Sequence, residues 1–237
     1  MPDLLPRRAN LGCGWDIRPG FLNIDLHGFH KPDLVGDITD LPQLPSGHFE
    51  ALVAQDVLEH LERGKVPGAI AEWSRLLAPG GVIELRMPSL LHLMAMLASP
   101  EWRTPEKAAE VTHLMFGSQA YNGDYHLSGY TPALLVKLLG DAGLLVCEAR
   151  VRDGWLFELR ARKAAALTVP EEVVGQCYFE ELHRPADAAG LAGFAAAMRD
   201  GMTEAALRNA LRGSDEAEFL RHNPSFLVPY RGQTIGA

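Results

Sequence analysis

The sequence of 237 residues has few cysteines, no long hydrophobic run and no excess of positive charge. Its three cysteines, Cys13, Cys147 and Cys177, form no Cys-x-x-Cys pair, which argues against a zinc or disulfide framework and is typical of a reducing compartment. The opening "MPDLLPRRANLG" lacks the apolar core of a signal peptide, and "PSLLHLMAMLA" is too short and interrupted to span a bilayer. We therefore expect a cytoplasmic protein without a membrane span.

Basic residues are outnumbered by acidic ones, and the formal net charge is -8. An acidic surface repels phosphate backbones, so we expect no nucleic-acid partner. A hydrophobic content of 47% allows a sizeable core, and the length suits one domain with a small appendage.

Short apolar runs alternate with helical patterns from residue 7 to residue 163. Candidate strands cover residues 7–12, 21–26, 32–38, 49–56, 81–88, 144–151 and 155–163. Helical spacing covers 66–77 and 131–143, the second with Thr131 as its N-cap and Pro132 in its first turn. This alternation predicts an α/β fold, a Rossmann-like, doubly wound and mostly parallel sheet with helices on both faces. Only a short turn separates the last two candidate strands, so we expect the closing strand of the sheet to be antiparallel.

The pattern changes after about residue 164. Residues 171–222 are helical and rich in alanine, with no candidate strand. We expect one domain over residues 1–164 and a small, all-helical accessory domain over 165–237, joined by a linker.

The motif "NLGCG", residues 10–14, follows the first strand. Ligands of open parallel sheets bind beyond the carboxyl ends of the strands, and glycine lets the main chain approach a ligand closely. Asp25 ends the next strand, where an acid can hold both ribose hydroxyls of a nucleoside. The third glycine of the dinucleotide fingerprint is missing, which favours a nucleoside without phosphates. Cys13 is interpreted as a small buried residue rather than a nucleophile.

Four motifs, "NLGCG", "FLNIDL", "GDITDLPQLPSGHFEALVAQDVLEHL" and "EWSRLLAPGGVIELRMP", give the chain a resemblance to class I S-adenosylmethionine-dependent methyltransferases over residues 7–162. "WDIRPGFLNID" is similar to a small bacterial subgroup linked to surface-polysaccharide genes. The resemblance implies S-adenosylmethionine as the cofactor, and it implies the following contacts. Gly12, Cys13 and Gly14 would line its methionine portion, Asp25 its ribose, Asp37 and Ile38 its adenine, and Gln55, Asp56 and Val57 would close the site.

The segment "DVLEH" has two further interpretations. Asp56 and Glu59 match a capping box, in which the first residue caps a helix and the second reaches back. Asp56, Glu59 and His60 would also share a helical face able to hold a cation, which is the less favoured alternative to a site without metal. His27 and His30 lack a third ligand, so we expect a solvated loop there.

Residues 113–132, "HLMFGSQAYNGDYHLSGYTP", are expected to form a loop at the crevice that binds the methyl acceptor. His126 is the candidate general base, because histidine titrates near neutral pH. His113, Tyr121, Asp124 and Tyr130 are candidate acceptor contacts. The alternative is a surface loop in which His126 only hydrogen-bonds the main chain.

The tail motifs "HRPADAAGLAGF" and "SDEAEF" resemble domain-of-unknown-function family 4214, which accompanies bacterial glycan-associated proteins. A generic helical bundle that mediates oligomerisation or contacts a glycan enzyme is the alternative. The sequence thus predicts a methyltransferase that acts on a sugar hydroxyl of a polysaccharide or its precursor. Methylation of a small metabolite on oxygen or nitrogen, and a non-catalytic scaffold that binds the cofactor, remain open.

Overall fold

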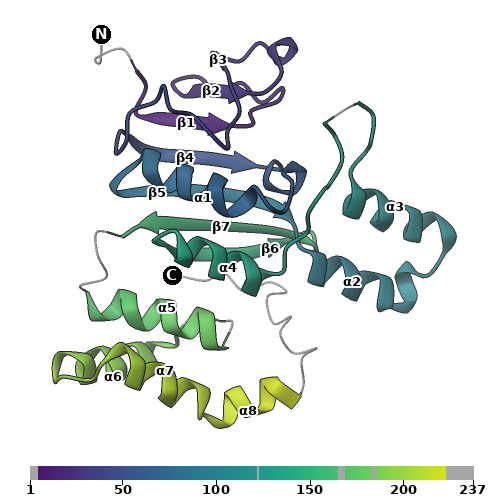
Figure 1. Cartoon of the computed structure of the whole chain (residues 1–237). Coiled ribbons are helices and arrows are strands. Elements are labelled where there is room, and N and C mark those ends of the chain that lie inside the picture. The colour runs from purple at the N-terminus through teal and green to yellow at the C-terminus, as the bar shows by residue number, and fades with distance from the viewer. Residues whose placement is uncertain (1–4, 122, 165–168, 183, 185, 223–237) are drawn as a thin grey trace.

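The chain folds around a seven-stranded sheet with the order β3-β2-β1-β4-β5-β7-β6 (Figure 1). The computed structural model describes residues 5–121, 123–164, 169–182, 184 and 186–222. The strands are β1 (Arg8–Leu11), β2 (Leu22–Asp25), β3 (Leu34–Val35), β4 (Phe49–Gln55), β5 (Leu77–Pro88), β6 (Leu144–Arg152) and β7 (Leu156–Lys163). They agree closely with the candidate strands, although β3 is shorter and β5 begins earlier than the sequence predicts.

Only β7 runs against the other strands. It pairs antiparallel with both β5 and β6, whereas β1 through β5 pair in parallel. Asp153 and Gly154 adopt φ of 54° and 80° between β6 and β7, and such left-handed backbone reverses a chain within a few residues. The predicted fold class, a mostly parallel Rossmann-like sheet with one antiparallel closing strand, is confirmed.

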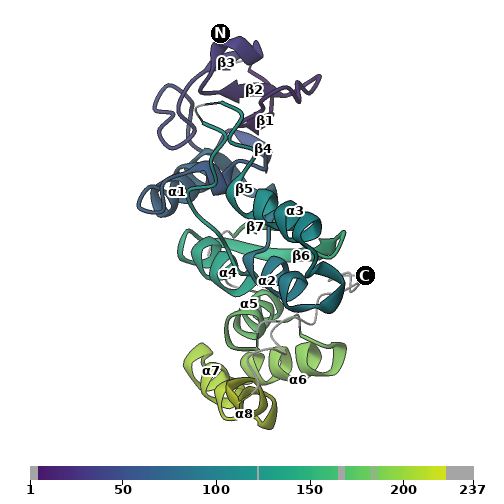
Figure 2. The same ribbon diagram turned by 90° about the vertical axis from the view of Figure 1, so that its right-hand side faces the viewer.

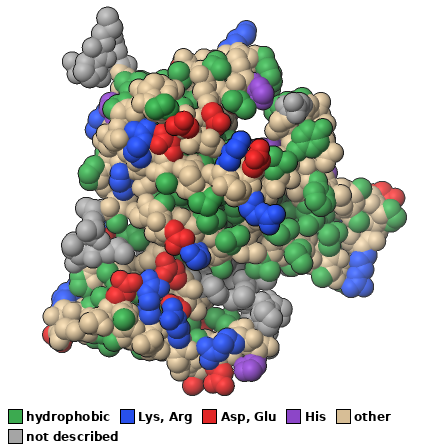
Figure 3. Space-filling model, viewed as in Figure 1, with side chains coloured by type: hydrophobic (Ala, Val, Ile, Leu, Met, Phe, Trp, Pro, Cys, Tyr) green, Lys and Arg blue, Asp and Glu red, His purple; other side chains and the backbone are tan. Residues whose placement is uncertain are grey.

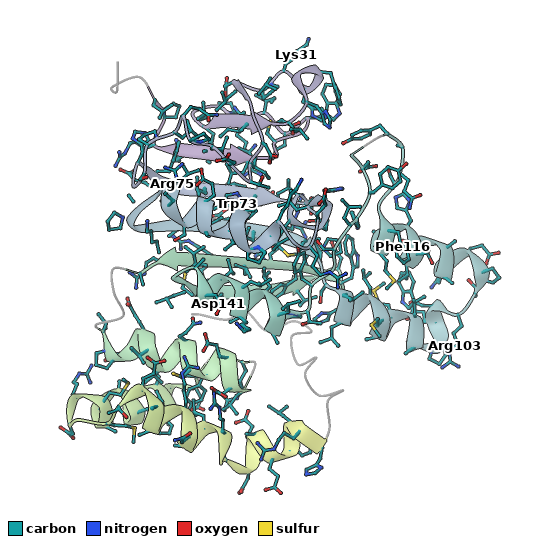
Figure 4. The ribbon with its side chains drawn as sticks, viewed as in Figure 1. Lys31, Trp73, Arg75, Arg103, Phe116 and Asp141 are labelled. Atoms are coloured by element: carbon teal, nitrogen blue, oxygen red, sulfur yellow. The ribbon has the colours of Figure 1, made fainter. Side chains whose placement is uncertain are left out.

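Two helices, α1 (Val66–Leu76) and α4 (Pro132–Asp141), lie on the same side of the sheet (Figures 1 and 2). Helix α1 buries Ile70 and Trp73 in the main core, and the indole N–H of Trp73 donates to the carbonyl of Ile38 at 2.9 Å. Trp73 and Arg75 are marked on this helix in Figure 4. As the sequence predicts, Thr131 caps α4 by accepting from the main-chain N–H of Leu134.

A helical hairpin of α2 (Leu90–Ala98) and α3 (Pro105–Phe116) projects past the strand ends, with Phe116 marked at its end (Figure 4). The expected loop over 113–132 is therefore shorter than predicted, because His113 lies in the last turn of α3. The side chain of Thr104 caps that helix and Pro105 occupies its first turn, a start signal present in the sequence.

Strand connections on the other half of the sheet use little helix. Residues 12–21 form turns between β1 and β2, and the short 3-10 helices η2 (Gly28–His30) and η3 (Leu58–His60) follow β2 and β4. A third, η4 (Pro100–Trp102), joins α2 to α3. The carboxyl ends of β1, β2 and β4 are consequently lined by turns.

The edge strand β6 carries a bulge between Val146 and Glu148. Its outer positions include Glu148, Arg150 and Arg152, which are exposed. Charged residues and bulges on an edge strand are typical of natural sheets.

Four helices follow the sheet: α5 (Pro170–Leu182), α6 (Ala188–Arg199), α7 (Glu204–Arg212) and α8 (Asp215–His222). They share a buried cluster of their own that includes Val174, Cys177, Leu207 and Leu211, while α5 contacts α4 and β6. Acidic and basic side chains are interspersed over this unit (Figure 3). The predicted linker is the segment "KAAALTVPEE", and its residues 165–168 lie outside the described residues, as do residues 223–237. The domain boundary at 164 stays a prediction.

Within the described ranges, no helix combines the length and the apolar character needed to cross a membrane.

Candidate functional site

The turn that leaves β1 exposes main chain at the carboxyl edge of the sheet. Gly12 and Gly14 adopt φ of 62° and 49°, a backbone that residues with a side chain rarely adopt. A Cβ on Gly12 would come 2.2 Å from Cγ2 of Val57, whereas a Cβ on Gly14 would point into open space. Gly12 thus permits close packing against the turn after β4, and Gly14 leaves a bare surface for a ligand.

Between these glycines, the side chain of Cys13 is 5% exposed. Burial raises the pKa of its thiol to about 11, and Asp25 adds to the effect. A thiol that stays protonated at neutral pH is a poor nucleophile, which agrees with the interpretation as a small buried residue.

Asp25, at the end of β2, is held in one orientation by three donors. Its Oδ1 accepts from the main-chain N–H of His27 at 2.8 Å and lies 2.9 Å from Nδ1 of His30, and its Oδ2 accepts from the main-chain N–H of Gly14 at 2.8 Å. Burial alone would raise the pKa of Asp25, but these hydrogen bonds outweigh it and hold the pKa below its usual value. Oδ2 has one protein donor, so it retains a lone pair for a ribose hydroxyl.

His30 was expected in a solvated loop, and that expectation is wrong. Its side chain is 4% exposed because Asp25 supplies a buried acceptor for its ring. Trp15, Phe29 and Tyr121 gather around it, with ring centroids 4.9, 4.2 and 6.4 Å from that of His30. The sequence analysis did not single out this aromatic cluster, which flanks the predicted ribose position.

Two buried asparagines anchor the turn between β1 and β2. The amide of Asn10 donates to the carbonyl of Asp16 at 2.7 Å, and Oδ1 of Asn23 accepts from the main-chain N–H of Arg18 at 2.8 Å. Buried amides are costly unless they are paired, so these bonds fix the course of a segment that lacks helix. The sequence analysis missed both residues, although polar residues inside short apolar strands are a usable signal.

The structure does not bring the two predicted adenine contacts together on an open surface. Asp37 is exposed and accepts hydrogen bonds from the main chain and hydroxyl of Thr39. The side chain of Ile38 is 6% exposed and belongs to the main core.

The residues after β4 have partners that the sequence analysis did not foresee. Gln55 accepts from the guanidinium of Arg18 at 2.8 Å, and Asp56 forms a two-pronged ion pair with Arg86 of β5. The predicted capping box is wrong: η3 is a 3-10 turn with Val57 at its N-cap and no side-chain cap. Asp56, with φ of 52°, is engaged by Arg86 instead of capping a helix.

A cavity of about 600 Å³ opens beside this turn, between the strand ends and the segment that follows α3. Figure 3 shows a gap at this side of the molecule. Predicted acceptor residues line the cavity together with groups that the sequence analysis missed. They are His113, Tyr121, Asp124 and His126, with Asp56, Glu59, His60, Arg86, Arg152, Asp153 and Trp155 among the other lining residues.

Tyr130 does not join them. Its side chain is 4% exposed, and its hydroxyl contacts Ser128 at 2.7 Å and donates to the carbonyl of Leu58 at 3.3 Å. The expected acceptor contact is therefore replaced by a packing role under η3.

Hydrogen bonds to main-chain atoms connect η3 to residues 125–130. The N–H groups of Leu127 and Ser128 both donate to the carbonyl of Glu59, at 2.8 and 3.1 Å. Nδ1 of His60 lies 3.1 Å from the carbonyl of Tyr125, and Nδ1 of His126 lies 3.3 Å from that of Met115. These hydrogen bonds hold the rings of His60 and His126 together, with their centroids 4.9 Å apart. Burial and the neighbouring His60 lower the pKa of His126.

Among the residues that line the cavity, Glu59 has an unusual environment for a carboxyl group. Its side chain is 2% exposed, and neither carboxylate oxygen has a hydrogen-bond partner among the described residues. Burial raises its pKa to about 8. Perturbed, buried carboxyl groups beside a cleft are typical of functional sites.

Comparison with known proteins bears on the first third of the chain, which holds the glycine turn and Asp25. Residues 3–85 match the family model of a methyltransferase domain. No curated protein matches the chain.

Several solved structures are similar to part of this chain at low sequence identity. A possible exported protein from Bordetella parapertussis is 16% identical with a TM-score of 0.49, over 68% of this chain and 63% of that one. An S-adenosylmethionine-dependent methyltransferase from Mesorhizobium loti is 15% identical with a TM-score of 0.49, over 66% and 90%. The 1,6-didemethyltoxoflavin-N1-methyltransferase of Burkholderia thailandensis, solved with S-adenosylhomocysteine, is 14% identical with a TM-score of 0.44, over 66% and 70%.

The matched domain, the sheet order and the glycine turn together define a class of protein. They confirm the predicted enzyme class, a methyltransferase, and the predicted cofactor, S-adenosylmethionine. The bare main chain at Gly14 and the remaining lone pair on Asp25 fit that cofactor.

Proposed function

We propose that the chain methylates a hydroxyl group of a saccharide or glycan precursor. The cavity of about 600 Å³ beside the turn after β4, whose lining includes many charged and hydrogen-bonding side chains, carries this proposal. His113, Tyr121 and Asp124 offer hydrogen-bonding groups for a hydroxyl-rich acceptor, and the rings of Tyr121 and Trp155 offer apolar faces. A site of this size and polarity suits a sugar unit.

The donor and the acceptor meet at the strand ends. S-Adenosylmethionine supplies a methyl group on a positively charged sulfur, which an oxygen nucleophile displaces in line. The glycine turn holds the methionine portion and Asp25 holds the ribose, and the cavity wall orients the acceptor oxygen toward the methyl group. Holding both partners in this geometry removes much of the entropic barrier.

His126 is the proposed proton acceptor. A carbonyl oxygen can only accept, so the contact with Met115 makes Nδ1 the donor and leaves the lone pair on Nε2. Nε2 takes the proton of the acceptor hydroxyl while the oxygen bonds to the methyl carbon. The carbon–sulfur bond breaks, and the electron pair stays on sulfur as a thioether.

The helical unit is proposed as an accessory domain, bounded by residues 165–237. Its resemblance to domain-of-unknown-function family 4214 supports a glycan context and a bacterial source. We propose that it contacts a second copy or another glycan enzyme, and that the protein acts in the cytoplasm.

Methylation of a small metabolite is the second candidate function, because an open cavity of this volume also accepts a phenol or an amine. A neutral amine needs no base before transfer, so N-methylation would not depend on His126. A scaffold that binds the cofactor without turnover is the third candidate.

A methyl-transfer assay with labelled S-adenosylmethionine tests the proposal. Saccharides, small phenols and small amines are compared as acceptors for the wild-type chain, His126→Ala and the control His222→Ala on α8. We expect transfer to a saccharide that falls by a factor of about 10² to 10⁴ in His126→Ala and is unchanged in the control. Transfer only to phenols or amines would support the second candidate, and cofactor binding without any transfer would support the third.

A further inference from the structure

Three side chains at the cavity wall converge although they come from two distant parts of the chain. One ligand atom each from Glu59, His60 and His126 lies within 4.8 Å of the others. Glu59 and His60 belong to η3, and His126 belongs to the segment before α4. The hydrogen bonds between η3 and residues 125–130 hold these three side chains close together.

Glu59 lacks the partner that a buried carboxylate requires. Its oxygens are enclosed and accept no hydrogen bond from any described residue, and Arg86 is engaged by Asp56. A buried carboxylate normally pairs with a cation, donates as a neutral acid or binds a metal ion. Here one nitrogen of each of the two imidazoles lies within 4.8 Å of a Glu59 oxygen.

Both imidazoles make the outer hydrogen bond that is typical of metal-binding histidines. His60 and His126 each direct Nδ1 at a main-chain carbonyl, of Tyr125 and Met115 respectively. Each Nδ1 is therefore the protonated nitrogen, and each Nε2 carries a lone pair. Such a second hydrogen bond fixes the tautomer and ring orientation in metal-binding histidines.

We infer that Glu59, His60 and His126 bind one divalent transition-metal ion at the wall of the acceptor cavity. Two nitrogens and one carboxylate form a ligand set with open positions, as in catalytic zinc sites. Small side-chain rotations would bring the ligand atoms to the ~2.0–2.2 Å that Zn²⁺ requires. Imidazole ligands favour Zn²⁺, Co²⁺ or Ni²⁺ over Mg²⁺ and Ca²⁺, which prefer oxygen.

This ligand set differs from the one considered from the sequence. Asp56 is engaged by Arg86, so His126 takes the place of Asp56 in the ligand set. His126 lies 66 positions after His60 in the sequence. The site is also not a single helical face, because η3 is one short 3-10 turn.

The role of the ion in the reaction rests on the proposed function. A divalent cation lowers the pKa of a hydroxyl that it polarises, so the acceptor proton leaves to solvent water. The acceptor oxygen then forms its bond to the methyl carbon as the carbon–sulfur bond breaks. With the ion bound, the lone pair of His126 serves as a ligand, and the imidazole no longer acts as the base.

The test measures metal binding directly on the full chain after dialysis against a chelator. Zn²⁺ and Mg²⁺ are titrated calorimetrically, and Co²⁺ is followed by its visible absorption, for the wild type, Glu59→Gln and His126→Ala. His113→Gln is the matched control, since His113 lines the same cavity outside the ligand set. S-Adenosylhomocysteine binding is measured on each protein to report an intact fold.

We expect one Zn²⁺ per chain, no saturable Mg²⁺ binding, and at least a 100-fold loss of Zn²⁺ affinity in Glu59→Gln and His126→Ala but not in the control. Absence of saturable Zn²⁺ binding, or equal binding by the variants, would overturn the metal site. Retained S-adenosylhomocysteine binding and methyl transfer in that case would leave the proposed function standing with His126 as the base. Zn²⁺ binding without transfer to any acceptor would instead support the metal site and overturn the proposed function.

Discussion

The main-chain N–H of Gly14 donates to Oδ2 of Asp25 at 2.8 Å, and this bond helps to join the turn after β1 to the end of β2. It fixes the distance between the bare main chain and the carboxylate that we propose as the two contacts of the cofactor. The proposed cofactor corner is therefore a preformed unit of two strands.

Asp25→Ala should abolish most cofactor binding. The change removes the proposed acceptor for a ribose hydroxyl and releases Gly14 and His30 from their partner. Loss of a charged hydrogen bond costs ~1.5–3 kcal/mol, so we expect affinity for S-adenosylhomocysteine to fall about 10- to 100-fold by calorimetry. Asp141→Ala on α4 is a matched surface control, and equal affinity in both variants would contradict the assignment.

Stability in acid should depend on the same carboxylate. The pKa of Asp25 lies below its usual 3.8 in the folded chain, so its contribution is present above that value and is lost as the pH falls through the folded pKa. Asp25→Asn should therefore show a smaller fall in unfolding free energy between pH 5 and the acid limit, measured by urea titration. The wild type and Asp25→Asn would behave alike if the carboxylate were unperturbed.

Gly12→Ala should destabilise the fold. The new methyl group would lie 2.2 Å from Cγ2 of Val57 on a backbone with φ of 62°. Overpacking typically costs ~1–3 kcal/mol and left-handed strain about a further 1 kcal/mol. Adding Val57→Ala removes the contact at 2.2 Å but leaves Cβ of residue 57 at 2.9 Å and the left-handed backbone, so the double variant should recover only part of the unfolding free energy. No recovery would mean that the backbone conformation alone requires glycine.

Cys13→Ala should leave cofactor affinity within about two-fold of the wild type. The thiol is buried, and its pKa of about 11 keeps it protonated. An alkylating reagent at pH 8 should modify exposed Cys147 before Cys13, as peptide mass mapping can follow. Rapid modification of Cys13 in the native chain would contradict its burial.

Arg208→Ala should weaken the helical unit. Its guanidinium pairs with Glu180, Glu181 and Glu204, which join α7 to α5 and to its own first turn. Removing one member of a partly buried network leaves carboxylates facing each other, at a cost of about 1–3 kcal/mol after solvent screening. Thermal unfolding should shift down for this variant and much less for the exposed control Arg221→Ala.

The sequence was a good guide wherever a signal is local. Strands that stop at Asp25 and at Asp56, the cap at Thr131 and the glycine turn follow from short-range patterns. The cap at Thr104 was equally readable, and overlooking it placed His113 in a loop.

The wrong predictions concern residues whose interaction partners cannot be recognised from the local sequence. Arg86 engages Asp56 from the next strand, and no spacing within "DVLEH" reveals that competition. Glu59 and His126 lie close together because main-chain hydrogen bonds join two segments that are more than 60 residues apart in the sequence. The sequence predicts a solvated His30 because His27 and His30 lack a third metal ligand, and their spacing does not reveal Asp25 as the partner of the His30 ring.

The bulge and the arginines on β6 also limit how copies of this chain can associate. Unpaired amides along a flat edge would let a second sheet add strand to strand, the first step toward fibrils. A kinked edge with Arg150 and Arg152, beside α5, disfavours that growth. Self-association at high concentration should consequently avoid continuous β-structure across this edge.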